Sequence, residues 1–474
     1  MRKLNEECGV FGICAPESRD LSTLTYYGLT ALQHRGQESA GIVVNDQGVF
    51  TACREAGLVS DIFSSVRLKE LGMGTIAVGH VRYATTGADR KRNVQPLLIN
   101  HHKGRMALCH NGNLVNAFEL RKELEENGSI FHTTTDSEVI AYLTVQERLR
   151  CGSIEEAVSR AMRRIDGAYS LVISSSRKLI AVRDPHGFRP LCMGKREDGA
   201  IVFASESCAL DAVGAAFVRD VLPGEIIVAE KGAVRSSIRP LGSCPKTLPK
   251  TLCAFEYIYF SRPDSIIDGV SVTLARQNAG LLLAKEHPAA ADLVIGVPDS
   301  GLDAAIGYAR GSGIPYAMGF TKNKYIGRTF IAPTQELREA GVDLKLNPIS
   351  SVVTGKRVVL IDDSIVRGTT SKRIIAQLRR AGAAEVHMRV CAPPFTAPCW
   401  YGTDIDSPEN LIANRHTPEE IAKLIGADSL GYLSLDSVRQ FSPEGLCTAC
   451  FGGGYPTAVP AHGEKARFEG KIVD

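Results

Sequence analysis

The sequence predicts two domains of different class, an α+β domain with layered antiparallel sheets followed by an α/β domain with a parallel sheet. The chain has 474 residues, which is long for one hydrophobic core and comfortable for two. Residues 8 to about 240 read mainly as short strands and turns with few helices. After about residue 245, continuous apolar strands alternate with helices, the pattern of βαβ units.

In the first half, short apolar or alternating runs are closed by Gly, Asn and Asp, which predicts strands. Apolar residues recur at helical spacing from Leu21 to Leu32, and this run ends at Gly36. A second helix is expected over residues 136–149. Helices outside two antiparallel sheets make an α+β layered domain. The expected strands are residues 8–13, 40–46, 74–84, 104–114, 167–175, 178–184 and 201–207.

In the second half, helices and buried strands are expected in strict alternation. Residues 230–252, which contain prolines and several basic side chains, are the expected linker. We therefore expect domains at residues 8–240 and 241–474, preceded by a leader of residues 1–7. The expected helices are residues 273–287, 302–313 and 371–382, and the strands are 292–298, 356–363 and 384–394.

Composition and charge exclude several classes of protein. The formal net charge is only +3, so neither nucleic acid nor an anionic membrane is an expected partner. No stretch approaches the ~18 uninterrupted apolar residues of a membrane span, and the polar start of the chain is unlike a secretory signal. The 13 cysteines therefore read as reduced cytoplasmic thiols, with room for a metal site or a catalytic thiol.

The stretch "VVLIDDSIVRGTTSKRII", residues 358–375, predicts a phosphate site. A buried strand ends in two carboxylates, Asp362 and Asp363, and a turn rich in Ser, Gly and Thr opens the next helix. The free N–H groups of such a turn and the hydroxyls of Thr369 and Thr370 suit a phosphate. The two carboxylates are expected to face sugar hydroxyls or a hydrated Mg²⁺. Taken alone, an Asp-Asp pair is more often an acidic turn before a capped helix.

The whole strand–turn–helix string resembles the ribose-phosphate loop of the type I phosphoribosyltransferases, which bind phosphoribosyl pyrophosphate (PRPP) with Mg²⁺. The resemblance implies that Asp362 and Asp363 contact the ribose and that the turn takes the 5′-phosphate. "VIGVPDSG", residues 294–301, fits the family's pyrophosphate turn, and residues 321–341 fit a lid, although a plain surface loop is the alternative. Implied PRPP contacts are Asp362, Asp363, Ser364, Arg367, Gly368, Thr369, Thr370, Asp299, Ser300 and Gly301, with Mg²⁺ near Ser300, Asp362 and Asp363.

Five motifs in the first half occur in one order and together resemble the glutamine-hydrolysing domain of the N-terminal-nucleophile amidotransferases, a four-layer αββα fold. The resemblance implies that Cys8 is the nucleophile and that residues 1–7 are a propeptide removed at the Glu7–Cys8 bond. A thiol with a pKa of ~8.5 needs a base, and a freed α-amino group supplies one. The motifs are "ECGVFGI", "LQHRGQESAGI", "GHVRYATTG", "CHNGNL" and "TTTDSE".

The same resemblance implies roles for four other residues. Arg82 is expected to bind the glutamine α-carboxylate, and Asp136 is expected to bind its α-ammonium group. Asn111 and Gly112 are expected to form the oxyanion hole. No histidine base is required, so His80 and His110 are expected to be structural. Singly, an Asn-Gly pair is a common turn and Thr-Asp-Ser a common helix cap.

A CxxC pair, Cys447 and Cys450, lies near the C-terminus, and a lone pair of this kind is weak support for a metal site. The whole chain, however, resembles the glutamine PRPP amidotransferases, in the branch with a propeptide and a [4Fe–4S] cluster. That resemblance implies Cys253, Cys399, Cys447 and Cys450 as cluster ligands, although zinc would accept the same four. It also implies a homotetramer and feedback inhibition by purine nucleotides.

The implied function is conversion of PRPP, glutamine and water to 5-phosphoribosylamine, glutamate and pyrophosphate, the first step of purine biosynthesis. Ammonia released at Cys8 is expected to reach PRPP without meeting solvent. Two alternatives stay open at this point. One is a glutaminase that feeds a different acceptor, and the other is a PRPP-sensing regulator without catalytic activity.

Overall fold

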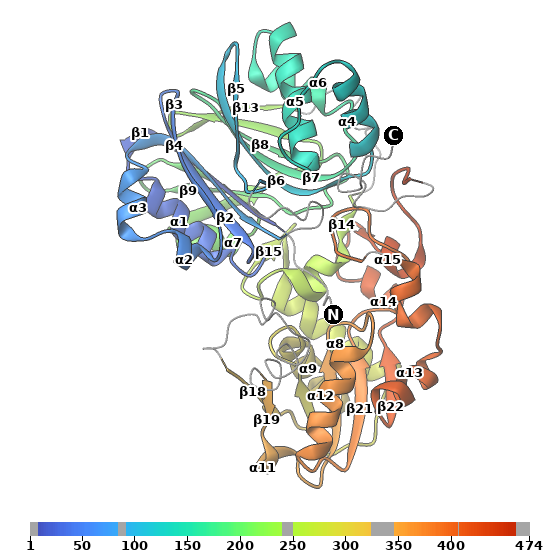
Figure 1. The fold of residues 1–474 in the computed structure, drawn as a ribbon. Helices are drawn as coiled ribbons and strands as arrows, with labels where there is room; N and C mark the ends of the chain where they lie inside the picture. Colours follow the sequence, from blue (N-terminus) through green and yellow to red (C-terminus); the bar gives the residue numbers. More distant parts are fainter. Residues whose placement is uncertain (1–7, 84–91, 239–249, 324–345, 406, 461–474) are drawn as a thin grey trace.

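The structure is a computed structural model, which describes residues 8–83, 92–238, 250–323, 346–405 and 407–460 (Figure 1). The expected leader, the core of the expected linker with its boundary at 240/241, and residues 324–341 of the expected lid lie outside the described residues. No helix in the described ranges is both long and apolar enough to cross a membrane.

The first half contains two antiparallel sheets, as predicted (Figure 1). The seven-stranded sheet has the order β11-β9-β10-β1-β4-β2-β3, and the six-stranded sheet has the order β13-β12-β8-β7-β6-β5. The strands are β1 (Gly9–Arg19), β2 (Ser39–Asp46), β3 (Val49–Ala56), β4 (Gly74–Arg82), β5 (Leu97–His101), β6 (Gly104–Leu114), β7 (Gly167–Ser174), β8 (Leu179–Arg183), β9 (Cys192–Arg196), β10 (Ile201–Ala204), β11 (Ala215–Asp220), β12 (Ile226–Glu230) and β13 (Ala233–Ile238).

Three apolar cores make these sheets the two inner layers of four. The core between the sheets includes Val10, Val78 and Val172, and each outer face has a further core against helices. The predicted αββα arrangement is therefore confirmed. The helices on the seven-stranded sheet are α1 (Ser22–Ala31), α2 (Val59–Ile62), α3 (Ser65–Glu70) and α7 (Ser207–Ala212), and those on the six-stranded sheet are α4 (Ala117–Glu126), α5 (Asp136–Arg150) and α6 (Ile154–Ala161).

The expectation of few helices in this half was wrong. Only α1 and α5 were predicted, and α2, α3, α4, α6 and α7 were not. Helix α6 illustrates how a helix that was not predicted is stabilised. The hydroxyl of Ser153 accepts a hydrogen bond from the N–H of Glu156 and caps the helix. Ile154, Ala157, Val158 and Ala161 then bury one face against the sheet.

The second half has a parallel sheet of four strands in the order β17-β20-β21-β22. Helices α8 and α9 pack closely because Gly280 and Gly307 let the backbones meet; a Cβ on either glycine would lie 1.8 Å from a carbonyl oxygen of the facing helix. The strands are β17 (Leu293–Gly296), β20 (Arg357–Asp362), β21 (Glu385–Val390) and β22 (Ser429–Tyr432), and the principal helices are α8 (Val272–Glu286), α9 (Gly301–Ser312), α12 (Thr369–Arg380) and α13 (Pro418–Ile425).

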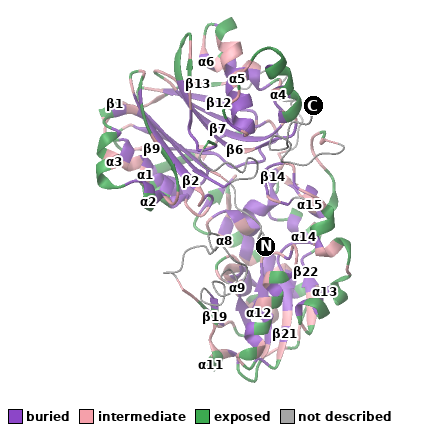
Figure 2. Cartoon of the chain, viewed as in Figure 1, coloured by how far each residue is buried: buried purple, intermediate pink, exposed green. Residues whose placement is uncertain are grey.

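The predicted alternation of helices and strands in this half is confirmed. Figure 2 shows buried strands through the interior of both halves and exposed residues on outer helices such as α4 and α13.

Short elements complete the described chain: β14 (Leu252–Cys253), a π-helical turn (Glu256–Phe260), β15 (Ile266–Ile267), β16 (Val270–Ser271), β18 (Phe320–Lys322), β19 (Leu346–Pro348), α11 (Ser350–Val353), two 3-10 turns (Pro408–Asn410 and Ile412–Asn414), α14 (Leu435–Arg439), β23 (Leu446–Cys447) and α15 (Ala449–Gly452).

Candidate functional site

Cys8 lies directly before β1, a central strand of the seven-stranded sheet. Since Gly9 pairs with Val81 on the antiparallel strand β4, Cys8 lies beside the end of β4, where Arg82 is buried. The Cys8 thiol donates to the Tyr83 carbonyl over 3.5 Å. Its own carbonyl accepts a 3.1 Å hydrogen bond from Nε of Arg35. Cys8 is half-buried, so it is both held in place and open to a ligand.

Asn111 and Gly112 lie in β6 of the facing sheet. Nε2 of His80, on β4, lies 2.9 Å from the His110 carbonyl, so the two strands meet next to Asn111. The Asn111 side chain is buried, and among the described residues neither of its polar atoms has a hydrogen-bond partner. An unsatisfied buried amide costs ~1–3 kcal/mol, a cost that a bound ligand would relieve.

Gly112 adopts a backbone conformation that only glycine tolerates here. Its φ is +144°, and a Cβ at this position would lie 2.1 Å from the Ala168 carbonyl oxygen. The close approach of β6 to β7 therefore excludes a side chain at this position.

Asp136 is the first residue of α5, where the helix dipole favours a negative charge. Its Oδ2 accepts a 2.8 Å bond from the Leu114 N–H, and its Oδ1 lies 3.6 Å from Nδ1 of His110. Burial alone raises the pKa of this carboxyl, but His110 and two backbone N–H groups outweigh burial, so the net pKa is lowered. The group is thus an ionised, buried carboxylate near Asn111 and Gly112.

His80 on β4 and His110 on β6 are both buried. Burial lowers the pKa of His80 to about 3, so its ring is neutral near pH 7. Nδ1 of His110 lies 3.0 Å from the Ser137 hydroxyl. These contacts fit the expected structural role.

The expected PRPP residues lie in two turns at one edge of the parallel sheet. β17 and β20 are neighbouring parallel strands, so the turns after Gly296 and Asp362 meet at their carboxyl ends. The Ser300 hydroxyl donates to Oδ2 of Asp363 over 2.5 Å, and the Ser364 hydroxyl donates to Oδ1. Lys322, on β18, forms an ion pair with Asp299.

Two glycines give these turns their shape. A Cβ on Gly301 would lie 2.6 Å from the Ile361 carbonyl oxygen, so the first turn packs directly on β20. Gly368, with φ +75°, is the N-cap of α12. Arg367 precedes this cap, and Thr369 and Thr370 follow it in the first turn of the helix, where free N–H groups suit an anion.

The four expected cluster cysteines line one pocket between the halves of the chain. Their neighbours there include the rings of Phe188, Phe255 and Tyr401. Burial raises the pKa of the Cys450 thiol well above its usual value, and the other three cysteines raise it further. In the described ranges, however, no group of three or more His, Cys, Asp or Glu side chains is arranged to hold a metal ion. A set of four thiols in an apolar pocket fits the donor chemistry of a cluster or zinc. These cysteines are Cys253, Cys399, Cys447 and Cys450.

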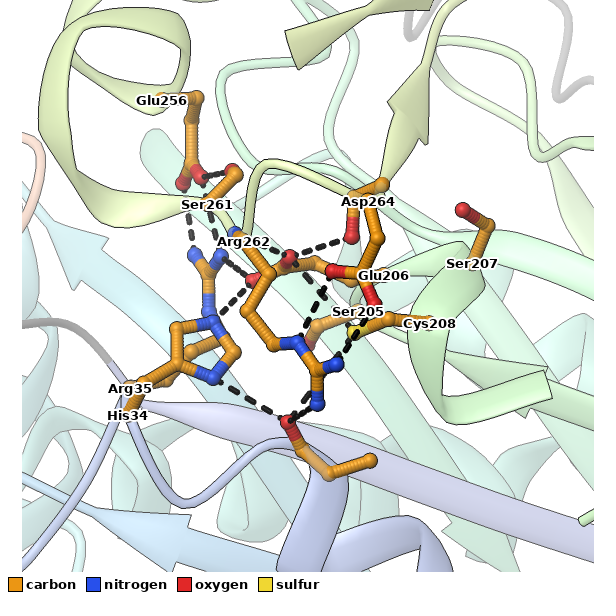
Figure 3. A network of polar contacts seen from close by, with 12 residues as sticks. His34, Arg35, Ser205, Glu206, Ser207, Cys208, Glu256, Ser261, Arg262 and Asp264 are labelled. Carbon is orange, nitrogen blue, oxygen red and sulfur yellow. Dashed lines mark hydrogen bonds and ion pairs between the residues drawn. The ribbon is translucent and has the colours of Figure 1, made fainter. Parts of the chain in front are cut away.

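A buried ion-pair network that the sequence did not predict joins the segment around Cys8 to the π-helical turn Glu256–Phe260 (Figure 3). Arg35, which holds the Cys8 carbonyl, donates to Glu206 over 2.6 Å and to both carboxylate oxygens of Glu256 over 3.0 and 2.7 Å. Glu256 begins the π-helical turn that also contains Tyr259. Burial raises the pKa of Tyr259, and so do the nearby carboxylates of the second site, Asp363 first among them.

The sequence contains only indirect signals for this network. Arg35 stands in "LQHRGQESAGI", and Glu206 stands in the expected strand 201–207. Glu256 stands three residues after Cys253. The pairing of Arg35 with Glu256 joins residues 221 positions apart, which spacing alone cannot reveal.

Comparisons with known proteins gave matches to both halves of the chain. Residues 80–212 match the family model of a glutamine amidotransferase domain, and residues 275–399 match that of a phosphoribosyl transferase domain. The amidophosphoribosyltransferase of Methanocaldococcus jannaschii is 49% identical over 95% of this chain and 98% of that protein. The amidophosphoribosyltransferase of Bacillus subtilis is 48% identical over 97% of this chain and 96% of that protein.

Two solved structures are similar to this chain over nearly its whole length. One is a glutamine phosphoribosylpyrophosphate amidotransferase of B. subtilis complexed with ADP and GMP, with a TM-score of 0.87, 47% identity and coverage of 96% of this chain and 98% of that one. Another, described as the allosteric regulatory enzyme of purine biosynthesis, has a TM-score of 0.88, 46% identity and coverage of 96% of this chain and 97% of that one. The chain belongs to the amidophosphoribosyltransferase family.

Proposed function

We propose that the two sites act in sequence as a glutamine-dependent amidotransferase, with Cys8 as nucleophile and the two turns of the parallel sheet as the PRPP site. The observation that carries the proposal is the buried Asn111 side chain, which has no partner among the described residues and lies beside the glycine-only position Gly112. This combination near a half-buried thiol supports an oxyanion hole.

In the first site, the Cys8 thiol gives its proton to the α-amino group of the same residue and attacks the glutamine amide carbon. The oxyanion lies against the Asn111 amide and the Gly112 N–H. The C–N bond breaks, ammonia leaves with the proton, and water hydrolyses the thioester to glutamate. Arg82 holds the substrate carboxylate and Asp136 holds the ammonium group.

This mechanism requires Cys8 to be the first residue of the mature chain. While Glu7 remains attached, the nitrogen of Cys8 is an amide and cannot accept the proton. We therefore propose that residues 1–7 are a propeptide. The intact mass of the purified chain under denaturing conditions tests this: loss of these residues is expected, and an active enzyme that keeps them would contradict the mechanism.

In the second site, ammonia displaces pyrophosphate from C1 of PRPP and gives 5-phosphoribosylamine. Asp362 and Asp363 bind the ribose hydroxyls, and the turn before α12 binds the 5′-phosphate through Ser364, Arg367, Gly368, Thr369 and Thr370. Asp299, Ser300 and Gly301 face the pyrophosphate. The hydrogen bond from Ser300 to Asp363 supports one shared site for the three residues proposed to hold Mg²⁺, Ser300, Asp362 and Asp363. When bound, Mg²⁺ neutralises charge on the leaving pyrophosphate.

The four-cysteine pocket is proposed to hold a [4Fe–4S] cluster through Cys253, Cys399, Cys447 and Cys450. All four thiols line this one pocket, and the other three cysteines lie close enough to raise the pKa of the Cys450 thiol, which supports one common ligand. We also propose a cytoplasmic homotetramer that purine nucleotides inhibit, with residues 321–341 as a lid over PRPP.

Substitution of Cys8 by Ser tests the function. The variant is expected to lose glutamine-dependent synthesis of phosphoribosylamine and to keep ammonia-dependent synthesis. A Cys8→Ser variant that keeps both activities would overturn the proposed role of Cys8. Absence of ammonia-dependent synthesis from the unmodified enzyme would favour a different acceptor or a PRPP-sensing regulator.

A further inference from the structure

We propose that residues 400–402, which follow Cys399, are a positioning element for the glutamine site: they hold the part of β6 that carries Asn111 and Gly112. The proposal rests on the oxyanion-hole role assigned to these two residues above. It adds a function for a segment that lies about 290 residues further along the chain, beside the four-cysteine pocket.

The first contact is a hydrogen bond that joins the two halves of the chain. Asn113, the residue after Gly112, donates through Nδ2 to the Trp400 carbonyl over 2.9 Å. The Asn113 side chain is only 6% exposed, so this bond is shielded from competing water. It fixes the end of β6 immediately beside the oxyanion hole.

The second contact is between two backbones. Gly402 has φ +117°, and a Cβ built on it would lie 3.4 Å from the Gly112 carbonyl carbon and 3.6 Å from the Gly112 Cα. The same Cβ would lie 3.1 Å from Nη2 of Arg189. An alanine side chain at position 402 would therefore lie in van der Waals contact with Gly112 and tightly against Arg189, on a backbone conformation that favours glycine.

The segment is itself fixed on the side of the cysteine pocket. Arg189, fully buried, donates to the Tyr401 carbonyl from Nε over 3.1 Å and from Nη2 over 2.5 Å. The rings of Tyr401 and Phe188 stack with centroids 4.1 Å apart. The Tyr401 N–H points to Sγ of Cys399 over 3.4 Å. These contacts connect Cys399, through Tyr401, to Trp400 and Gly402, which lie next to Asn113 and Gly112.

An oxyanion hole acts through donors that are already in place, and loss of one donor costs about 10²–10³-fold in kcat. Displacement of β6 by the 400–402 segment is therefore expected to lower kcat for glutamine by up to about 10²-fold. The KM for glutamine is expected to change less than kcat, because Arg82, which is proposed to bind the substrate carboxylate, lies on β4, whereas only Asp136 is bonded to the end of β6, through the Leu114 N–H. Ammonia-dependent synthesis at the second site is expected to remain within about twofold, as it makes no use of the oxyanion hole.

The test compares Gly402→Ala with Gly313→Ala in the full-length enzyme. Gly313 also has a left-handed φ, +75°, but a Cβ on it meets nothing within 4 Å. Asn113→Ala is the second variant, and it removes the bond to Trp400 without altering the 400–402 segment. The measurements are kcat and KM for glutamine and the rate with ammonia in place of glutamine.

A selective fall in kcat for Gly402→Ala and Asn113→Ala, absent in Gly313→Ala, supports the proposal. Unchanged glutamine kinetics in both variants would overturn it, and so would a rise in KM alone or an equal loss of the ammonia-dependent rate. If Gly402→Ala does not fold, Asn113→Ala decides by the same criteria. Cys8→Ser in the same assay separates the two claims, since a Cys8→Ser enzyme that still uses glutamine overturns the proposed function itself.

Discussion

Arg35 and Glu256 form a two-point ion pair with no solvent exposure, at 2.7 and 3.0 Å. The third nitrogen of Arg35 holds the Cys8 carbonyl, and Glu256 begins the turn that leads to Tyr259 beside the second site. One guanidinium group therefore contacts both the glutamine site and the segment that leads to the PRPP site.

Replacement of Arg35 by Lys is expected to destabilise the protein and to lower glutamine-dependent activity. Lysine keeps the charge but cannot bond two carboxylates and a carbonyl at once in this geometry. Removing one partner of a buried ion pair lowers the free energy of unfolding by about 3–5 kcal/mol. The Lys variant keeps the charge, so its loss is expected not to exceed this range. Urea unfolding measures it, with Arg67→Lys, an exposed partner of Glu55, as the control. Equal unfolding midpoints for the two variants would contradict the account.

His80 is expected to make stability fall at acid pH. Its folded pKa, about 3, lies below the ordinary histidine value, so the unfolded chain binds a proton that the folded chain rejects. Above pH ~6.5 His80 is neutral in both states and does not lower the free energy of unfolding. As the pH falls from ~6.5 toward ~3, protonation of His80 in the unfolded chain lowers the free energy of unfolding by at most about 1.4 kcal/mol per pH unit. His80→Gln is expected to show a shallower loss in urea unfolding between pH 6.5 and 4.5. Parallel curves for the two proteins would refute this source of acid sensitivity.

Asp363→Asn is expected to weaken PRPP use. The carboxylate accepts from Ser300 and Ser364 and so holds the two turns together. Its proposed hydrogen bond from a ribose hydroxyl, as a bond to a charged group, is worth about 1.5–3 kcal/mol, or roughly 10- to 150-fold in affinity. The KM for PRPP measures the effect. Asp292→Asn, in an exposed pair with Arg357 just before β17, is the control, and a similar change in both would exclude a specific role for Asp363.

If the proposed [4Fe–4S] cluster is bound, Cys447→Ser is expected to remove it. Protein purified without oxygen should contain iron and acid-labile sulfide, and the variant should contain neither in stoichiometric amount. Cys53→Ser, in β3 of the first half, is the matched control and should retain both. Zinc in place of iron in the unmodified protein would show that the four cysteines serve a different metal.

The elements that sequence predicted best are those with strong periodicity and clear ends. The run before Asp362 and the turn at Gly368 mark β20 and α12 at their observed places. By contrast α4 was missed, although Ala117, Leu120 and Leu124 lie on one buried face, because so short a helix is stabilised mainly by the sheet beneath it.

The candidate site residues were predicted where they stand in motifs, whereas contacts between distant segments appear only in the structure. Cys253 and Cys447 were predicted as ligands of one site, but the short parallel strands β14 and β23 that place them side by side were not predicted. The approach of Gly402 to Gly112 likewise brings a loop of the second half against strand β6, and no local sequence pattern connects the two.

The central claim is that this family member couples two sites within one chain. Glutamine hydrolysis measured with and without PRPP and Mg²⁺ tests it most directly. The account predicts slow hydrolysis without PRPP and a marked increase when PRPP is added, with ammonia transferred to product. Equal rates of glutamate formation under both conditions would contradict coupling between Cys8 and the PRPP site.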